Sequence, residues 1–284
     1  MASESLVNRC TPLSLALALL AASAQAATPV ADCRTAATGA FTSFPLLIPV
    51  GRGDRQGASY CLANLHSGEV AMWNGAGGFD QPAMVPVAKD GFKAAAGSVG
   101  NYHWLQATEV SEAGIVTAST VHYFSNPGPA PTAMLHLPKA DLEIVPQPLP
   151  REHWRYRAGE TWKFLVRFRN QPLKTADVHM ETSGGTRQTF KTDAQGIVQV
   201  AFPDDLSHET HRGGHDHGRR TQNRFVLAVS LDEADGRHYL TAFNHIYEPS
   251  ADHGHNLLAG LGFLGLGGLF AVPLIIRRKD RNNA

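Results

Sequence analysis

This sequence has few cysteines, no net charge and little of the apolar periodicity that predicts helices. The chain has 284 residues with three cysteines, and its 25 Lys and Arg residues are balanced by 25 Asp and Glu residues. A chain without net charge, and without a long basic run outside its C-terminal end, has little to attract it to nucleic acid. It also contains no G-x-S-x-G or H-E-x-x-H frame, so we expect no enzyme.

The N-terminal end has the pattern of a secretory signal peptide. Arg9 precedes an apolar segment from Pro12 to Ala22, and Ala24-Gln25-Ala26 forms a small-residue cleavage site. We therefore expect residues 1–26 to be removed and the mature chain to begin at Ala27, outside the cytoplasm.

The C-terminal end has the pattern of a membrane anchor. The apolar run from Leu257 to Ile276 is about 20 residues long, which is enough for a helix to cross the hydrocarbon core. A basic cluster follows at once, and such a flank stays on the cytoplasmic side. We predict a single-pass protein of the cell inner membrane, with a transmembrane helix at 257–276, a cytoplasmic tail at 277–284 and most of the chain in the periplasm. The glycines of the run leave one alternative, which is a sorting signal removed after export.

Two cysteines remain after the leader is removed. Cys10 lies within residues 1–26, whereas Cys33 and Cys61 belong to the exported chain. Thiols in an oxidising compartment are expected to pair. Because the two lack a C-x-x-C spacing, we predict a structural disulfide rather than a metal or redox site.

Between its two ends, the sequence predicts β structure throughout. Turn residues separate short runs of alternating or apolar residues, and no comparably long segment has a 3.6-residue apolar period. We predict an all-β protein with two immunoglobulin-like β-sandwich domains, at 27–140 and 141–250, with a boundary near Lys139. The predicted strands are Ser59–His66, Glu69–Trp73, Tyr102–Val110, Ile115–Phe124, Ala133–Leu137, Leu142–Val145, Thr161–Phe168, Ala176–Thr182, Arg187–Thr192, Ile197–Phe202, Phe225–Leu231 and Tyr239–Tyr247.

A family resemblance covers roughly residues 141–248. Its pieces are Leu142-Glu143-Ile144-Val145-Pro146, then Gly159-Glu160 leading into Phe164, Val166 and Phe168, then Pro172-Leu173 with Ala176 and Val178, then Thr192-Asp193 with Gly196. In order and spacing they resemble a bacterial periplasmic family, domain of unknown function 4198, which is grouped with NikM-type nickel-uptake accessory proteins. The resemblance implies an immunoglobulin-like sandwich, a fold that hosts many unrelated functions. From the residues themselves, we expect a turn at Asn170-Gln171-Pro172 and a tight connection at Asp193 to Gly196.

Histidine is concentrated in an insertion at 203–224, between two predicted strands. Four of the chain's 14 histidines lie there, and neutral imidazole is a good ligand for nickel, cobalt, copper(II) or zinc. Two local pairs can each chelate, two acidic side chains can complete the shell, and the glycines between the pairs let the loop fold back. The predicted metal ligands are His208, His211, His215 and His217, with Glu209 and Asp216.

A second histidine pair, His253 and His255, stands just before the predicted membrane helix. Its position predicts a weak metal site at the mouth of a membrane partner. Either cluster also has a simpler interpretation as a solvated, Gly-rich linker. The remaining candidates, including His103 and His122 on aromatic strands, are better explained as hydrogen-bonded core or rim histidines.

Two hypotheses about function follow. The first is a membrane-anchored periplasmic accessory protein that binds a divalent transition metal or delivers it to an inner-membrane metal transporter. The second is a non-catalytic envelope interaction module with β-sandwich domains and no metal role, whose partner is another envelope protein. The metal itself, among nickel, cobalt, copper and zinc, is left open by the residue types.

Overall fold

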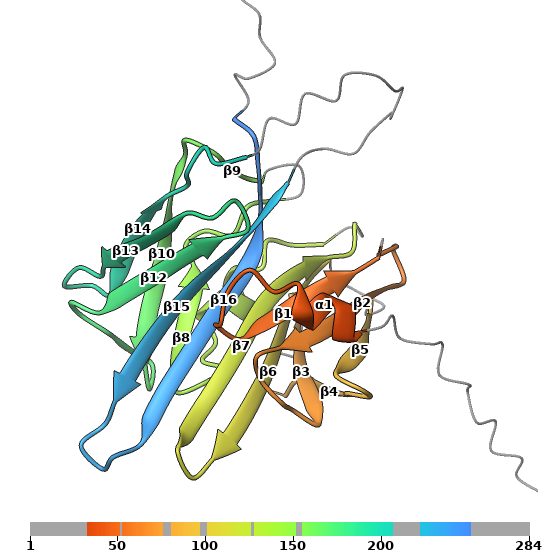
Figure 1. Cartoon of the computed structure of the whole chain (residues 1–284), viewed down its shortest axis with the longest axis horizontal. Coiled ribbons are helices and arrows are strands. Elements are labelled where there is room, and N and C mark those ends of the chain that lie inside the picture. Colours follow the sequence, from red (N-terminus) through yellow and green to blue (C-terminus); the bar gives the residue numbers. More distant parts are fainter. Residues whose placement is uncertain are drawn as a thin grey trace, which may run out of the picture.

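The computed structural model describes residues 33–51, 53–75, 81–96, 101–125, 128–151, 155–206 and 222–250 (Figure 1). The predicted signal peptide, transmembrane helix and cytoplasmic tail lie outside these ranges. Within them, no helix has both the length and the apolar character needed to span a membrane. The described chain is mostly β structure, as the sequence predicts.

Two short helices and many strands make up the described chain. The elements are α1 (Cys33–Thr38), β1 (Leu46–Val50), β2 (Gly57–Ala63), β3 (Glu69–Asn74), β4 (Ala83–Pro86), β5 (Gly91–Ala95), β6 (Tyr102–Ser111), β7 (Gly114–Tyr123), α2 (Thr132–His136), β8 (Leu142–Pro146), β9 (Tyr156–Arg157), β10 (Thr161–Phe168), β11 (Gln171–Pro172), β12 (Asp177–Thr182), β13 (Arg187–Lys191), β14 (Ile197–Ala201), β15 (Asn223–Asp232) and β16 (His238–Glu248).

One long sheet runs through the molecule. Its strand order is β13-β12-β15-β16-β7-β6-β3-β4, and β9 pairs with the end of β16. At its centre β16 pairs with β7 in parallel, from His238 opposite Gly114 to Phe243 opposite Ser119. Strands from both sides of the expected boundary near Lys139 therefore belong to one continuous sheet, while the division into two domains stays a prediction.

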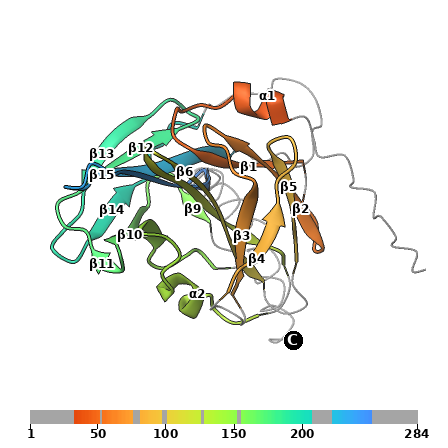
Figure 2. The ribbon, with the colours of Figure 1, turned by 90° about the horizontal axis from the view of Figure 1, so that it is seen from below.

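Two smaller sheets cover opposite faces of the long sheet. β1, β2 and β5 form one of them, and β8, β10, β14 and β11 form the other. Neighbouring residues of β16 separate the layers, since Phe243 packs in the core beneath β10 whereas Ala242 packs against β1. Figure 2 shows α1 and α2 on the two opposite sides. This alternation is what a strand buried on both faces requires.

The largest core is rich in aromatic rings. The Tyr156 ring lies 5.0 Å from Trp162 and 5.2 Å from both Phe202 and Phe225, measured between ring centroids. Edge and offset contacts at such distances add about 0.5 to 1.5 kcal/mol each beyond area burial. Trp104 of β6 belongs to the same core, so the first half of the chain helps to bury the second.

A buried ion pair fixes the segment that joins α2 to β8. Arg167 Nε donates to Glu143 Oε2 at 2.6 Å, and the Arg167 guanidinium also donates to the carbonyl of Leu137 at 2.7 Å. Glu143 Oε1 in turn accepts from the backbone amides of Lys139 and Ala140 at 2.7 and 3.1 Å. Leu137, Lys139 and Ala140, at the expected boundary, are thus held by hydrogen bonds to side chains of β8 and β10.

Most predicted strands are confirmed, and one is wrong. The sequence predicts a strand over Ala133–Leu137, but Thr132–His136 form helix α2, with Pro131 at its N-cap. Ala, Met and Leu are strong helix formers, and a short apolar run does not reveal its period. Strands β1, β4, β5, β9 and β11 were not predicted from the sequence.

Two predicted turns also have clear outcomes. Asp193 and Gly196 form the expected tight connection, since the Asp193 carboxylate accepts from the amide of Ile197 at 2.9 Å and Gly196 has a φ of 72°. A Cβ at Gly196 would lie 2.6 Å from the carbonyl oxygen of Val166. The other turn is shifted, because Arg169 and Asn170 take the positive φ values of 47° and 62° that a two-residue hairpin needs, and Gln171–Pro172 already form the return strand.

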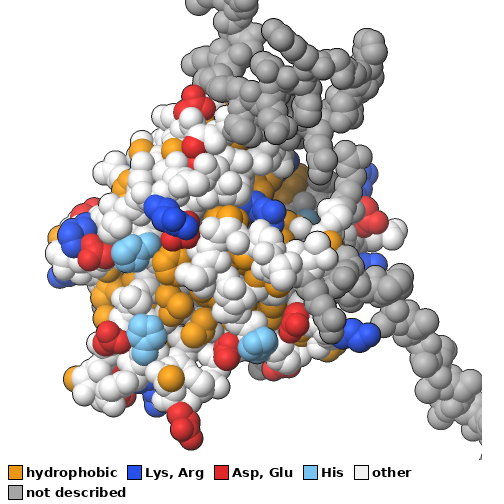
Figure 3. All heavy atoms as spheres, viewed as in Figure 1, with side chains coloured by type: hydrophobic (Ala, Val, Ile, Leu, Met, Phe, Trp, Pro, Cys, Tyr) orange, Lys and Arg blue, Asp and Glu red, His pale blue; other side chains and the backbone are white. Residues whose placement is uncertain are grey.

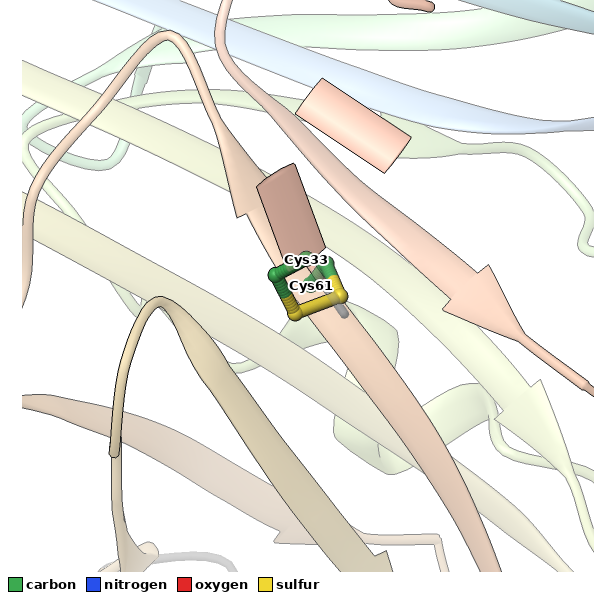
Figure 4. Close-up of a disulfide and its surroundings, with 2 residues drawn as sticks. All are labelled: Cys33 and Cys61. Atoms are coloured by element: carbon green, nitrogen blue, oxygen red, sulfur yellow. A yellow bond between two sulfur atoms is a disulfide. The ribbon is translucent and has the colours of Figure 1, made fainter. Parts of the chain in front are cut away.

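The predicted disulfide is confirmed. Cys33, the first residue of α1, is bonded to Cys61 of β2, with the two Cα atoms 5.4 Å apart (Figure 4). It closes a loop with a sequence separation of 28. A loop of this length corresponds to about 3 to 4 kcal/mol of stabilisation through the unfolded chain.

Candidate functional site

All eight predicted metal-ligand residues lie outside the described residues. They are His208, Glu209, His211, His215, Asp216, His217, His253 and His255. The structure does describe the residues that flank them, which end at Leu206 and at Ser250 and resume at Gln222. Among the described residues, no group of three or more His, Cys, Asp and Glu side chains is placed to hold a metal ion.

Asp205 joins the two ends of the histidine-rich insertion. Its backbone carbonyl and its Oδ1 atom both accept from Asn223 Nδ2 at 3.2 Å. The same carboxylate accepts from the hydroxyl groups of Thr182 and Tyr247. Burial raises the pKa of Asp205, but side-chain hydrogen bonds from Thr182, Thr186, Tyr247 and Asn223 outweigh it and hold the pKa below its ordinary value. Asp205 is therefore an ionised anchor at neutral pH.

The end of β16 lies against the same anchor. Asn223 and Tyr247 are register partners in the β15–β16 pair, and Gln222 Nε2 donates to Glu248 Oε1 at 3.0 Å. The chain entering the insertion, the chain leaving it and the chain that continues toward residue 253 therefore start from one small region. In Figure 1, this region is the end of β15 and β16 that lies next to β9.

The structure confirms the interpretation of His103 as a core histidine and places His122 beside it. His103 is fully buried on β6, and His122 is its cross-strand partner on β7. The Tyr60 hydroxyl lies 2.7 Å from His122 Nδ1. His179 is half-buried, with Nδ1 3.1 Å from the Thr189 hydroxyl.

A cavity of about 500 Å³ opens beside His122, where the sheet divides. The β7–β16 pairing ends at Ser119 and Phe243. At and beyond that point, side-chain hydrogen bonds from β7 take the place of backbone hydrogen bonds to β16. Ser119 Oγ donates to the Ala242 carbonyl at 3.1 Å, and Thr120 Oγ1 donates to the Asn244 carbonyl at 2.7 Å. The two strands then diverge, and the space between them is the cavity.

His245 lies in this gap together with His122. Burial lowers the pKa of His245 to about 4, and the positive charge of Arg155 contributes to that shift. Burial also lowers the pKa of His122 to about 4, helped by His103 and His245. Both imidazole rings are therefore neutral at pH 7.

No local sequence pattern indicates this cavity. Its basic residues, Arg55, Arg155 and Arg224, come from separate parts of the chain, and none belongs to a motif. They meet only because β7 and β16 are neighbours, and a parallel pairing across more than a hundred residues cannot be read from local patterns.

No protein-family model and no curated protein matches this chain. Among solved structures, it is similar to a 1.5-MDa bacterial ice-binding adhesin (TM-score 0.25, 14% identity, 73% of this chain and 66% of that chain). It is also similar to a Ca²⁺-stabilised adhesin with which an Antarctic bacterium binds ice (TM-score 0.26, 13% identity, 73% and 49%). A third is the D0–D1 domain of intimin (TM-score 0.24, 11% identity, 72% and 97%). This chain spans about two thirds of the first structure and about half of the second.

Proposed function

We propose that this protein is a membrane-anchored periplasmic accessory protein, with immunoglobulin-like sandwich layers, that binds a divalent transition metal and delivers it to a membrane transporter. The predicted ligands are the histidines of the insertion, His208, His211, His215 and His217, with His253 and His255 next to the membrane. The proposal involves no catalysis. Nickel, cobalt, copper(II) and zinc all suit imidazole ligands.

The contact between Gln222 and Glu248 carries this proposal. It places the end of the insertion beside the strand that leads to the second histidine pair. Residues 208 and 253 follow the last described residues before them, Leu206 and Ser250, by two and three positions. An extended chain spans at most about 3.6 Å per residue, so the first histidine of each cluster can be no farther than about 7 Å (His208 from Leu206) and about 11 Å (His253 from Ser250). Two weak sites tethered so closely act at a high effective concentration on one ion.

Metal titration of the full-length protein in detergent tests the proposal. Nickel, copper(II) and zinc are titrated by calorimetry into the wild type and into a variant with His208, His211, His215 and His217 replaced by Ala. We expect most of the binding to be lost in this variant while its thermal unfolding is unchanged. A variant with His66→Ala and His238→Ala, two exposed histidines on the folded body, serves as the control.

Equal metal uptake by the wild type and the four-histidine variant would refute the metal role. It would leave the envelope interaction module as the better hypothesis. One feature of the edge strand β4 favours that alternative. Met84 is a large apolar side chain exposed on this strand, where another protein could contact it.

Tethering is tested separately in cells. A chain that ends before Leu257 is expected to bind metal as well as the full chain but to fail in supporting metal-dependent growth, because it is no longer concentrated at the membrane. Full rescue by this soluble form would show that delivery does not depend on the anchor.

A further inference from the structure

The cavity between β7 and β16 is walled by several elements of the fold. The β1–β2 hairpin contributes Pro49, Arg55 and Tyr60, and the end of β7 contributes Thr120 to Tyr123. β15 and β16 contribute Arg224 and the stretch from Asn244 to Ile246. Figure 3 shows the surface hollowed in its upper half, right of centre, where basic, histidine and apolar side chains meet. A volume of about 500 Å³ lies in the range of small-molecule sites.

Three guanidinium side chains line this cavity, from Arg55, Arg155 and Arg224. None of the described residues that line it is acidic. Glu248 is a carboxylate in contact with this set, since its Oε1 lies 3.6 Å from Arg155 Nε. Three arginines and no acidic side chain among the described lining residues make this part of the lining positive. Such a concave, partly desolvated surface attracts anions.

The rest of the lining favours an anion with a carbon skeleton. Pro49, Val121 and Ile246 supply apolar wall between the charged groups. A single inorganic anion would fill only a small part of the volume of about 500 Å³. The neutral imidazoles of His122 and His245 add hydrogen-bonding groups without adding charge.

We propose that this cavity binds a small organic anion with two or three carboxylate groups, held by Arg55, Arg155 and Arg224. Guanidinium groups match carboxylates in planar, bidentate geometry. Because the three arginines come from separate elements, they suit a ligand with several carboxylates better than a ligand with a single carboxylate. Arg224 is the last residue of the 203–224 insertion, but the site uses none of the predicted metal ligands, and neither proposal requires the other.

Calorimetry on the full-length protein in detergent tests the proposal, with citrate, tricarballylate, acetate and inorganic phosphate as probes. Citrate and tricarballylate are expected to bind with one-to-one stoichiometry, and acetate and phosphate at least tenfold more weakly. Arg224→Gln and Arg55→Gln are each expected to weaken citrate binding about tenfold, because each removes a charged hydrogen bond. Arg187→Gln is the matched control, since Arg187 is an exposed residue on β13 that pairs with Glu181.

A chemical protection measurement on the wild type removes any dependence on how the variants fold. Phenylglyoxal modifies accessible arginines, and peptide mass spectrometry reports the modified fraction at each position. Citrate is expected to lower modification at Arg55 and Arg224 but not at Arg187. The proposal is overturned if neither tricarboxylate binds or if phosphate binds as tightly as citrate. It is also overturned if citrate protects the control residue Arg187 as well as it protects Arg55 and Arg224.

Discussion

The side chain of Asn244 pairs with both backbone polar groups of Leu47. Its Nδ2 atom donates to the Leu47 carbonyl at 2.9 Å, and its Oδ1 atom accepts from the Leu47 amide at 2.9 Å. Both residues are buried and lie 197 positions apart. The side-chain amide of Asn244 thus supplies the two hydrogen bonds that a neighbouring strand would otherwise make to Leu47. It joins β1 of the covering sheet to β16 of the long sheet.

Replacing this amide should be costly. Asn244→Ala leaves the amide and carbonyl of Leu47 buried without that partner, so we expect the free energy of unfolding to fall by about 2 to 4 kcal/mol. Urea denaturation followed by tryptophan fluorescence measures the change. Gln188→Ala, which removes an exposed amide from β13, should change stability by no more than about 0.5 kcal/mol. Similar values for the two variants would contradict the role given to Asn244.

The buried histidines predict a dependence of stability on pH. The pKa values of His122 and His245 are lowered from 6.5 to about 4 in the folded protein. Between these values the unfolded chain binds protons that the folded protein does not. Stability is therefore complete above about pH 6.5 and falls as the pH drops toward about 4, by roughly 2 kcal/mol for each ring once solvent contact is allowed for.

Urea denaturation at pH 7.5 and at pH 5 checks this dependence. The variants His122→Gln and His245→Gln should each reduce the difference in stability between the two pH values. His66→Gln should not, because its side chain is 86% exposed. A pH difference that is unchanged in both cavity variants would contradict the assignment.

Asp205 offers a test of the base of the insertion. Asp205→Asn removes an ionised acceptor of several hydrogen bonds, so we expect stability at pH 7 to fall by about 1 to 3 kcal/mol. Because the pKa of Asp205 is lowered on folding, this contribution is present above the unfolded-state pKa and is lost as the pH falls through the folded-state value. The two proteins should therefore converge in stability in acid. Asp204→Asn, one residue away and exposed, is the comparison and should change stability at pH 7 by less than Asp205→Asn does.

The shared sheet predicts that the halves of the chain depend on each other. Residues 141–250 alone would lose β7 as the partner of β16, and Trp104 and Tyr102 from their main core. We expect this fragment to show no cooperative thermal unfolding, and to regain it when mixed with residues 27–140. Circular dichroism with a temperature ramp measures both. Cooperative unfolding of the isolated fragment would instead support two independent domains.

Sequence patterns predict the strands of this protein better than their partners. The residue patterns of Thr161–Phe168 and Tyr239–Tyr247 predict both strands almost to the residue. Successive side chains of a strand point to opposite faces, and in these two strands the residues on the core-facing sides are buried or half-buried. The edge strand β4 has three exposed residues among its four and gives no such pattern. Local patterns contain no information that β16 lies beside β7, so the cavity between them could not be predicted. The histidine clusters stand out by composition alone, and their role stays a prediction.

The parallel pair at the centre of the sheet has a consequence for the order of folding. β7 is complete at Tyr123, but its neighbour in the sheet, β16, runs from His238 to Glu248. The segment before β7 can close its local disulfide early, whereas the middle of the long sheet has to wait for a strand more than a hundred residues later. Such non-local pairing slows folding and leaves strand edges open in the meantime. If the chain is exported as proposed above, it would carry an open edge on β7 until the residues of β16 have also crossed the membrane, and this is the interval in which a chaperone would bind it.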